Sequence, residues 1–270
     1  MNKQLILREQ EKIKDISTFS QHEGRVIAMV KGTDKVLFDE WNKVIISGSA
    51  FTAMKHFPNM IINDNLPSYN FAIGLDNIVS ITNQEKRDSG IVLFAVGIDG
   101  CGAENSQIYD VDYTKWIAPE HLVPFRYQLS DNDLDGLKRD LYFGRKENST
   151  TDRIAYYFKA FNSEPVFKQQ YVDGTAIDGN VYTSNNKLRA ESYVELKMSI
   201  EKEDCRDFFI ATTGIMDARI NTISLLTAYP KIIDGYTYYQ NIKPITKLNF
   251  SNIPLNDLDL GVDITYQIYY

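Results

Sequence analysis

The last nine residues of the chain, 262–270, place side chains on two sides in strict alternation. Val262, Ile264, Tyr266, Ile268 and Tyr270 share one side, and Asp, Thr and Gln side chains lie between them. A period of two over nine residues indicates a half-buried β-strand. Chain ends usually fray unless they are tied down. We therefore expect this strand to be paired into a sheet, either its own or that of a neighbouring molecule.

The same signature recurs along the chain. Alternating or β-branched and aromatic segments, separated by turn residues, predict about ten strands. These segments are 26–30 and 36–38 as a hairpin, 69–73, 91–98, 109–113, 154–161, 194–200, 220–228, 248–250 and 262–270. The run 91–98 is continuously apolar, which indicates a strand buried on both faces. The pattern predicts a mainly β chain, α+β with minor helix, with an antiparallel β-sandwich or jelly-roll-like core.

Helical patterns are few. The best one covers residues 3–16, and its thin apolar stripe suits an arm that docks on another surface as well as it suits a core helix. This stripe consists of Leu5, Ile6, Ile13 and Ile16. A second helix is expected within 47–57, stopped by Pro58. We therefore divide the chain into an N-terminal helical arm, 1–24, and a single β-rich domain, 25–270.

Composition limits the class of partner. The chain has 29 Lys and Arg against 36 Asp and Glu, a net charge of −7. This balance disfavours a broad nucleic-acid surface, because neutralising phosphates requires a surplus of basic residues. No run approaches the ~18 apolar residues of a membrane-spanning helix, and the first residues turn charged too early for a signal peptide. We expect a soluble protein without nucleic-acid or membrane partners.

The sharpest local motif is an acidic turn at 131–136. Asp131, Asp133 and Asp135 alternate along the chain and Gly136 follows, a spacing that can wrap oxygen ligands around a hard cation such as Ca²⁺. An EF-hand requires Glu at the twelfth loop position, where this chain has Tyr142. The two interpretations are a calcium site on these three carboxylates and an acidic surface turn that needs no cofactor.

Other reactive residues show no catalytic spacing. Cys101 and Cys205 fit no zinc or redox motif, so two free thiols are the simplest interpretation, and one disulfide between them remains open. The glycines at 97–102 follow an apolar strand but match neither a dinucleotide-binding loop nor a P-loop, and they predict a tight turn. The three histidines show no metal-ligand spacing. We assign no catalytic residue and expect that the protein is not an enzyme.

Several segments spread over most of the chain resemble structural proteins of tailed-bacteriophage virions. They share strands rich in Asn, Tyr and Ile, Asp-Gly turns and an absence of catalytic motifs. These segments are 42–48 with Phe51, 69–74, 96–102 leading to Tyr109, 123–127, 173–175, 218–221 and the strand that stops on Tyr270. The resemblance implies a scaffold role at the head-tail neck, the tail or the capsid exterior, in a protein made in the host cytoplasm and located in the virion.

The partners implied are copies of the protein itself, in a symmetric homo-oligomer, and other virion proteins. The predicted assembly interface is the terminal strand with Ile264, Tyr266, Ile268 and Tyr270, joined to a neighbour by strand addition. Deleting 263–270 is then expected to abolish assembly and to leave secondary structure nearly intact. The alternatives are a carbohydrate- or receptor-binding β-sandwich, with calcium at the acidic turn, and a glycosidase whose carboxylates the sequence does not identify.

Overall fold

The computed structural model describes residues 24–56, 68–69, 82–102, 107–112, 114–130, 141–171, 190–233, 235–256 and 261–270. The predicted arm, 1–24, lies outside the described residues except for Gly24, which begins the first strand. The predicted strand 69–73 also lies outside them except for Tyr69.

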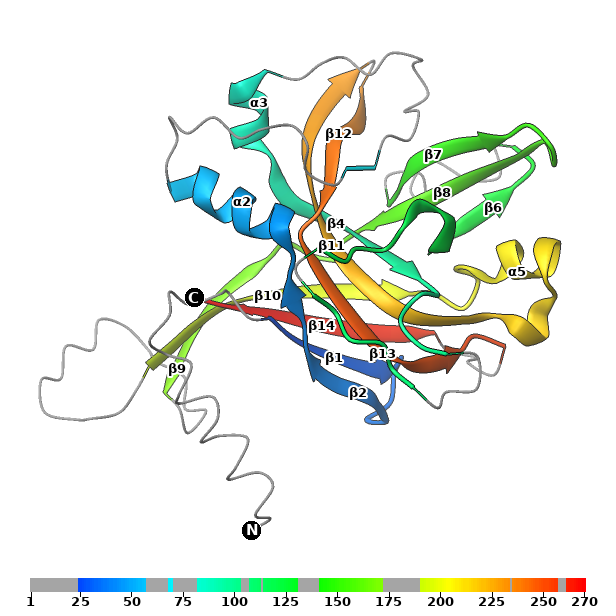
Figure 1. Cartoon of the computed structure of the whole chain (residues 1–270), viewed down its shortest axis with the longest axis horizontal. Helices are drawn as coiled ribbons and strands as arrows, with labels where there is room; N and C mark the ends of the chain where they lie inside the picture. Colours follow the sequence, from blue (N-terminus) through cyan, green and yellow to red (C-terminus); the bar gives the residue numbers. More distant parts are fainter. Residues whose placement is uncertain are drawn as a thin grey trace, which may run out of the picture.

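The chain is mainly β, with two antiparallel sheets packed together as in a β-sandwich, as the sequence predicted (Figure 1). The five-stranded sheet has the order β2-β1-β14-β10-β9. Its strands are β1 (Gly24–Val30), β2 (Val36–Trp41), β9 (Val166–Tyr171), β10 (Ala190–Ile200) and β14 (Val262–Tyr269). The β1–β2 hairpin, the strand at 194–200 and the terminal strand confirm three of the predictions.

The nine-stranded sheet has the order β3-β13-β11-β4-β8-β6, with β12 paired to β11, β5 to β4 and β7 to β8. Its strands are β3 (Lys43–Val44), β4 (Gly90–Gly97), β5 (Leu122–Val123), β6 (Arg126–Gln128), β7 (Tyr142–Asn148), β8 (Arg153–Ala160), β11 (Arg219–Ile233), β12 (Tyr236–Pro244) and β13 (Thr246–Pro254). The fifteen residues of β11 pair in turn with β13, β4 and β12. Strand β11 therefore brings β4, β12 and β13 into one sheet, a set of pairings that the local sequence pattern does not reveal.

Helices occupy the ends of the sheets. They are α2 (Ile46–His56), α3 (Asn83–Asp88), α5 (Arg206–Thr212) and the single 3₁₀ turns η2 (Pro119–His121) and η4 (Ile215–Asp217). The predicted helix at 47–57 is confirmed as α2. A full capping box begins α3, in which Thr82 accepts from the Glu85 amide and the Glu85 carboxylate accepts from the Thr82 amide. In Figure 1, α2 and α5 lie at opposite ends of the molecule.

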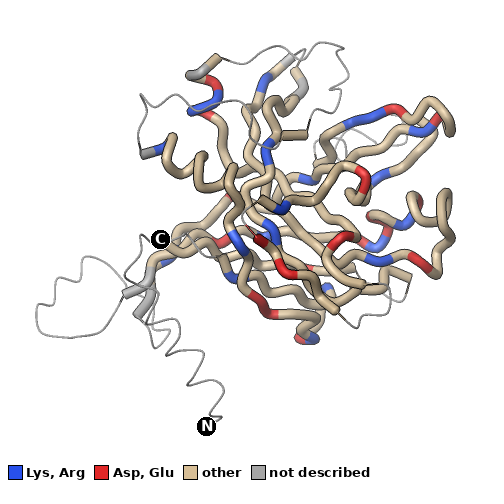
Figure 2. Tube along the Cα trace, viewed as in Figure 1, with Lys and Arg blue, Asp and Glu red and all other residues tan. Residues whose placement is uncertain are grey.

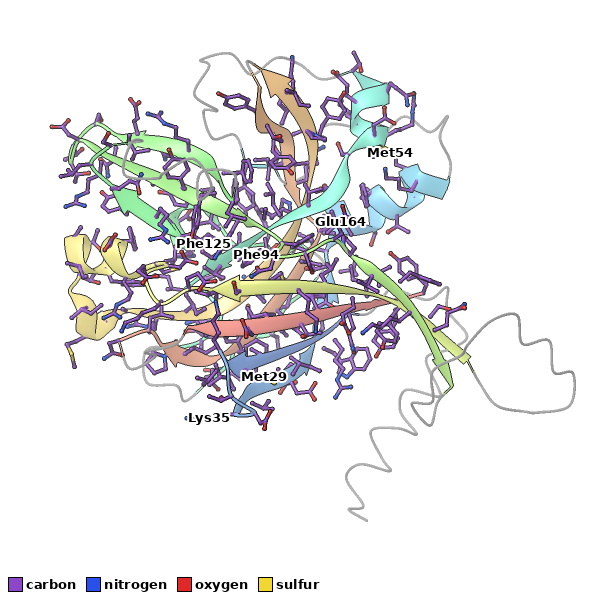
Figure 3. All side chains as sticks on the ribbon, turned by 180° about the vertical axis from the view of Figure 1, so that it is seen from behind. Met29, Lys35, Met54, Phe94, Phe125 and Glu164 are labelled. Carbon is purple, nitrogen blue, oxygen red and sulfur yellow. The ribbon has the colours of Figure 1, made fainter. Side chains whose placement is uncertain are left out.

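One hydrophobic core lies between the two sheets. Phe94 and Phe125 meet there edge to face with ring centroids 5.1 Å apart, and Figure 3 shows both side chains at the centre of the molecule. Phe38 of β2 stacks on Phe250 of β13 at 4.3 Å, which links the sheets directly. Residues of both sheets share this core, so it holds the two sheets together.

Strand β4 is buried on both faces, as its continuous apolar run predicted. Phe94 and Val96 belong to the core between the sheets. Leu93 and Ala95 point to a second cluster on the opposite face of the nine-stranded sheet, with Phe158 among its members. All four β4 residues have an exposed fraction of 0%.

Two sequence predictions are wrong in detail. No strand covers the described part of 109–113, where Asp112 Oδ1 instead accepts from the Thr114 and Lys115 amides and turns the chain. No strand is predicted between 114 and 153, yet β7 occupies 142–148 and pairs with β8 along its length. Tyr142 and Phe143 begin this strand, but the charged residues that follow them interrupt the apolar alternation by which a strand is predicted.

Candidate functional site

The predicted interface strand, β14, lies inside its own sheet. It pairs with β1 on one edge and β10 on the other, in register over seven and eight residue pairs. Ile264 and Tyr266 are 3% and 0% exposed and belong to the core between the sheets. Ile268 is half-buried and Tyr270 is 62% exposed. Of the four predicted interface residues, the structure therefore leaves only the last two at the surface.

The inner face of the five-stranded sheet continues beyond the core at this end. The register places Phe167, Val194, Ile268 and Gly24 side by side across β9, β10, β14 and β1. We call these four residues the apolar row. Phe167 is 61% exposed, whereas the next inward row contains the buried Tyr266. The row therefore marks the place where the nine-stranded sheet stops covering its neighbour.

A pocket of about 410 Å³ opens at the other end of this row, between the sheet and helix α2. Its lining is mostly apolar and comes from Gly24, Asn42, Val44, Gly48, Phe51, Thr52, Lys55, Ile91, Ile245, Thr246, Ile268 and Tyr270. Gly48 brings α2 close to the sheet, because a Cβ atom there would strike the Ile245 carbonyl oxygen. The size and the apolar lining are typical of a binding pocket.

The floor of the pocket is polar. Asn42 is 4% exposed, and its Oδ1 accepts from the Gly24 amide at 2.5 Å. Asn42 Nδ2 has no hydrogen-bond partner among the residues that the structure describes; it lies near the Tyr266 hydroxyl without a bond of normal geometry. That hydroxyl donates to Thr246 Oγ1 at 3.0 Å, and burial raises the pKa of Tyr266. The Asn42 amide nitrogen is itself closed to solvent, so it belongs to the packing beneath the pocket and not to its open surface.

The rim of the pocket carries one cation. Lys55 is exposed on the last turn of α2, and its ammonium group lies 5.2 Å from the centroid of the Phe51 ring. The same group donates to the carbonyl oxygen of Arg87 in α3. The pocket therefore combines a mostly apolar wall with one positively charged side chain.

Strand β9 forms an exposed edge of the five-stranded sheet. It pairs with β10 and with no other strand in the described part of the chain. Val166 is 50% and Phe167 61% exposed, although neighbouring residues of a strand point to opposite faces. Both faces of β9 are therefore open at this point, and Figure 1 shows β9 and β10 extending past the body of the molecule.

The outer face of this sheet is polar. Figure 2 shows Lys and Arg interspersed with Asp and Glu over the described part of the molecule. Cross-strand ion pairs join Arg25 to Asp39 at 2.6 Å and Lys168 to Glu195 at 2.9 Å. Burial raises the pKa of Glu195, but hydrogen bonds from lysines outweigh it, and the net pKa lies below the ordinary value. At the end of the sheet where the apolar row lies, the inner face is therefore apolar and the outer face is charged.

A cluster of charged side chains around Asp204 lies in the interior of the molecule. Lys159 Nζ donates to Asp204 Oδ2 at 2.6 Å and to the Ser199 carbonyl oxygen at 2.9 Å. The Tyr142 hydroxyl donates to Asp204 Oδ1 at 2.8 Å, and Arg126 Nε lies 3.3 Å from the same oxygen. Burial, followed by the Asp204 charge, raises the pKa of Tyr142. The Lys159 and Asp204 side chains are 2% and 0% exposed, so this cluster braces β6, β7 and β8 against the turn that follows β10.

A second cluster holds the glycine turn after β4. Lys247 Nζ lies 2.7 Å from Asp99 Oδ2, and His121 Nδ1 lies 3.9 Å from the same oxygen. Asn221 Oδ1 accepts from the Gly100 amide at 2.7 Å. A Cβ atom at Gly100 would strike the Asn221 carbonyl oxygen, which explains the glycine. The tight turn predicted at 97–102 is thus fixed by side chains of β11 and β13.

The remaining predictions concern metals, thiols and membranes. Asp131, Asp133 and Asp135 lie outside the described residues, and within those residues no three His, Cys, Asp or Glu side chains gather as a metal site. Cys101 and Cys205 are both buried and form no disulfide, as the simplest interpretation predicted, and burial raises the pKa of the Cys205 thiol. None of the described helices is long and apolar enough to cross a membrane.

Sequence reasoning missed both the pocket and the exposed edge. The segment 166–171 begins with Val-Phe but continues with Lys-Gln-Gln, which breaks the apolar alternation. The pocket joins residues from the hairpin, α2, β13 and the end of the chain, with Gly24 and Tyr270 separated by 246 positions, and no local pattern connects them. Comparison with protein-family models, curated proteins and solved structures finds no match to this chain.

Proposed function

We propose that this protein is a non-enzymatic structural subunit of a virion of the tailed-bacteriophage kind, which assembles through repeated contacts between copies of itself and with other virion proteins. The virion part of this proposal rests on the resemblance of its strand and turn segments. It implies synthesis in the host cytoplasm and location in the particle.

The observation that carries the assembly role is the apolar row with the β9 edge. Phe167 exposes 61% of its surface on an edge strand whose outer side is unpaired among the described strands. An edge of this kind is an aggregation hazard in a lone molecule and a joint in an assembly. Main-chain groups of the edge supply hydrogen bonds by strand addition, and the alternate side chains supply specificity.

The placement of buried charge is consistent with the same role. Lys159, Asp204, Asp99 and Lys247 each contact an opposite charge and connect elements of the fold. Separating such a pair would leave a buried charge uncompensated, so the pairs hold these elements in one arrangement. A framework that repeats in an assembly must hold its contact surfaces in fixed positions.

The test is the concentration dependence of molar mass, followed by light scattering, for the protein and for Phe167→Lys. We expect the unaltered protein to associate as concentration rises, and the lysine to weaken association at least about tenfold, because a charge would then be buried in the contact. Met216→Lys is the control, since Met216 is 80% exposed and lies in η4, outside the β9 edge.

A protein that stays monomeric at all accessible concentrations would contradict the proposal, as would equal association of both lysine variants. The virion location is tested separately, by mass spectrometry of purified particles from the source host. Absence of the chain from those particles would remove that part of the proposal and leave the assembly role to the scattering result.

A further inference from the structure

We infer that the β9 edge is the two-fold contact of a homodimer, in which β9 of one copy pairs antiparallel with β9 of a second copy and Gln169 faces Gln169 across the axis. This inference rests on the proposed assembly function and names the partner and the register of one of its contacts. Three observations carry it: the direction of the main-chain groups of β9, the sequence of the strand, and the charge on the opposite edge of the sheet.

The hydrogen bonds of β10 fix the direction of its main-chain groups. The Ser192 carbonyl oxygen accepts from the Tyr270 amide at 3.0 Å, which places Ser192 toward β14. The Lys197 carbonyl oxygen accepts instead from the Asn162 amide at 2.9 Å, in the connection that precedes β9. Because these groups alternate in direction along a strand, even-numbered residues of β10 bond toward β14 and odd-numbered residues bond toward β9.

The register of β9 on β10 then assigns each residue of the edge. Positions 166, 168 and 170 lie opposite the odd-numbered positions 195, 193 and 191, so their main-chain groups bond to β10. Phe167, Gln169 and Tyr171 direct their main-chain groups away from β10, where no other strand pairs with them in the described part of the chain. These three alternate residues form a template for one further strand.

Two-fold symmetry leaves few registers for self-pairing. An axis perpendicular to the sheet keeps each side chain on its own face and places one residue opposite itself. With the axis at Phe167, the outward-facing Gln169 meets Pro165, which has no N–H to donate. With the axis at Lys168, two ammonium groups lie directly opposite each other, which is destabilising. With the axis at Gln170, the outward-facing groups of Phe167 find no partner within β9.

The register centred on Gln169 pairs all the outward-facing residues. Phe167 of each copy faces Tyr171 of the other and Gln169 faces itself, so three facing pairs each exchange two main-chain hydrogen bonds. Lys168 lies opposite position 170, a glutamine, and keeps its ion pair within its own chain. This register therefore joins two five-stranded sheets without placing like charges opposite each other.

The opposite edge of the sheet, β2, is protected against strand addition. Asp39 and Glu40 are neighbours on this strand and both are exposed, so a carboxylate stands on each face of that edge. Charged side chains on an edge oppose the addition of a further strand. The only charged residue of β9 is Lys168, whose ammonium group already bonds Glu195 at 2.9 Å. The β9 edge is therefore better suited to a second β9 than to the β2 edge of the next molecule.

The test is cross-linking through a cysteine at the axis. The Cα atoms of a hydrogen-bonded antiparallel pair lie about 5.5 Å apart, a separation that a disulfide spans. Gln169→Cys should therefore give a covalent dimer under mild oxidation, seen on a non-reducing gel. Val166→Cys is the matched control, because Val166 is 50% exposed on the same strand but in this register lies about 20 Å from its counterpart along the strand.

The unaltered protein, whose Cys101 and Cys205 are buried, sets the background of this experiment. Cross-linking by Gln169→Cys alone is the expected result. Equal cross-linking of the two variants would indicate random collision, and absence of a cross-link at 169 would indicate another register or another partner at this edge. Either result would overturn the inference.

A second pair of variants tests the main-chain bonds themselves. Gln169→Pro removes an N–H that points away from β10, so the monomer keeps its pairing while the dimer loses two central hydrogen bonds. We expect association in light scattering to weaken at least about tenfold. Gln169→Thr is the control, because it keeps the N–H and loses the same side-chain hydrogen bond to Ser192. Equal association of these two variants would contradict strand addition at this position.

The two proposals fail separately. If the unaltered chain stays monomeric at every concentration, the assembly function fails and this contact fails with it. If the chain associates and Phe167→Lys weakens the association, while Gln169→Cys gives no dimer and Gln169→Pro associates normally, the assembly function stands and the two-fold β9 contact is wrong.

Discussion

Asp204 gathers several polar contacts in the interior of the molecule. It accepts from Lys159, Tyr142 and the Glu201 amide, and it lies 3.3 Å from Arg126 Nε. Its two oxygens therefore join three strands of one sheet to the turn that leaves the other. A fully buried ion pair need not stabilise more than an apolar pair would, but breaking one partner leaves a buried charge without compensation.

We predict that Asp204→Asn lowers the free energy of unfolding by about 3–5 kcal/mol, measured by urea denaturation, because Lys159 would keep its charge in an apolar interior. Asp39→Asn is the matched control, since Asp39 pairs with Arg25 at the surface, and its cost should stay below about 1 kcal/mol. Similar losses for both variants would mean that the Lys159 ammonium is not desolvated as the structure places it.

The Lys31–Glu201 pair links stability to pH. Burial raises the pKa of Glu201, but hydrogen bonds from Lys31 and Ser199 outweigh it, so the net pKa lies below the ordinary 4.5. A carboxylate with a lowered pKa contributes stability above its unfolded pKa, and this contribution is lost as pH falls through the folded pKa. The hydrogen bond to Glu201 raises the pKa of Lys31, so its contribution is lost only as pH rises above 10.5 and through that raised pKa.

We therefore predict that Glu201→Gln lowers the melting temperature between about pH 5 and 8 and has no effect once pH falls well below the lowered pKa. Glu164→Gln is the control, because Glu164 is exposed in the connection between β8 and β9 (Figure 3). A destabilisation by Glu201→Gln that is independent of pH would contradict the assigned role of this carboxylate.

At the scale of elements, β14 is the central strand of its sheet. The sequence suggested that removal of 263–270 would spare secondary structure, but β1 and β10 both lose their partner without it. Tyr266, the largest fully buried side chain, would leave with it. The strand is thus part of the folding core, and only the residues at its exposed end remain accessible for the assembly role proposed above.

We predict that a chain ending at residue 262 fails to fold, with loss of the far-UV circular dichroism typical of β-structure and of any cooperative thermal transition. A chain that lacks only Tyr270 should fold normally, because that residue lies beyond the strand and is 62% exposed. A well-folded protein ending at residue 262 would show that the pairing of β14 with its two neighbours is dispensable.

Local pattern predicted the elements better than it predicted their partners. The hairpin, β4, β8, β10, β11 and β14 follow from alternation or from apolar runs, because burial on one or two faces leaves a direct mark on the sequence. Strand β9 was not predicted, because it is an edge strand that faces solvent and its polar residues interrupt the apolar alternation. The strand predicted at 109–113 was wrong because an Asp side chain satisfied the local amides and favoured a turn.

At the scale of the whole molecule, the candidate sites depend on contacts that sequence spacing does not encode. Asn42 and Thr246 meet at the floor of one pocket from opposite ends of the chain. Lys159 and Asp204 are separated by 45 positions and by a change of sheet. The predicted interface residues were correct in periodicity, but the sequence could not show that the strand would be enclosed on both edges.

The double burial of β4 has a consequence for how this chain can change over time. Most strands of a sandwich keep one side in water, and substitutions accumulate there at little cost. Between Leu93 and Val96 every position touches an interior on one side or the other. Divergent versions of this protein should therefore vary most on the outer, polar face of the five-stranded sheet, while these four positions exchange only among apolar residues of similar volume. That makes the four positions the part of the chain by which distant relatives would be recognised.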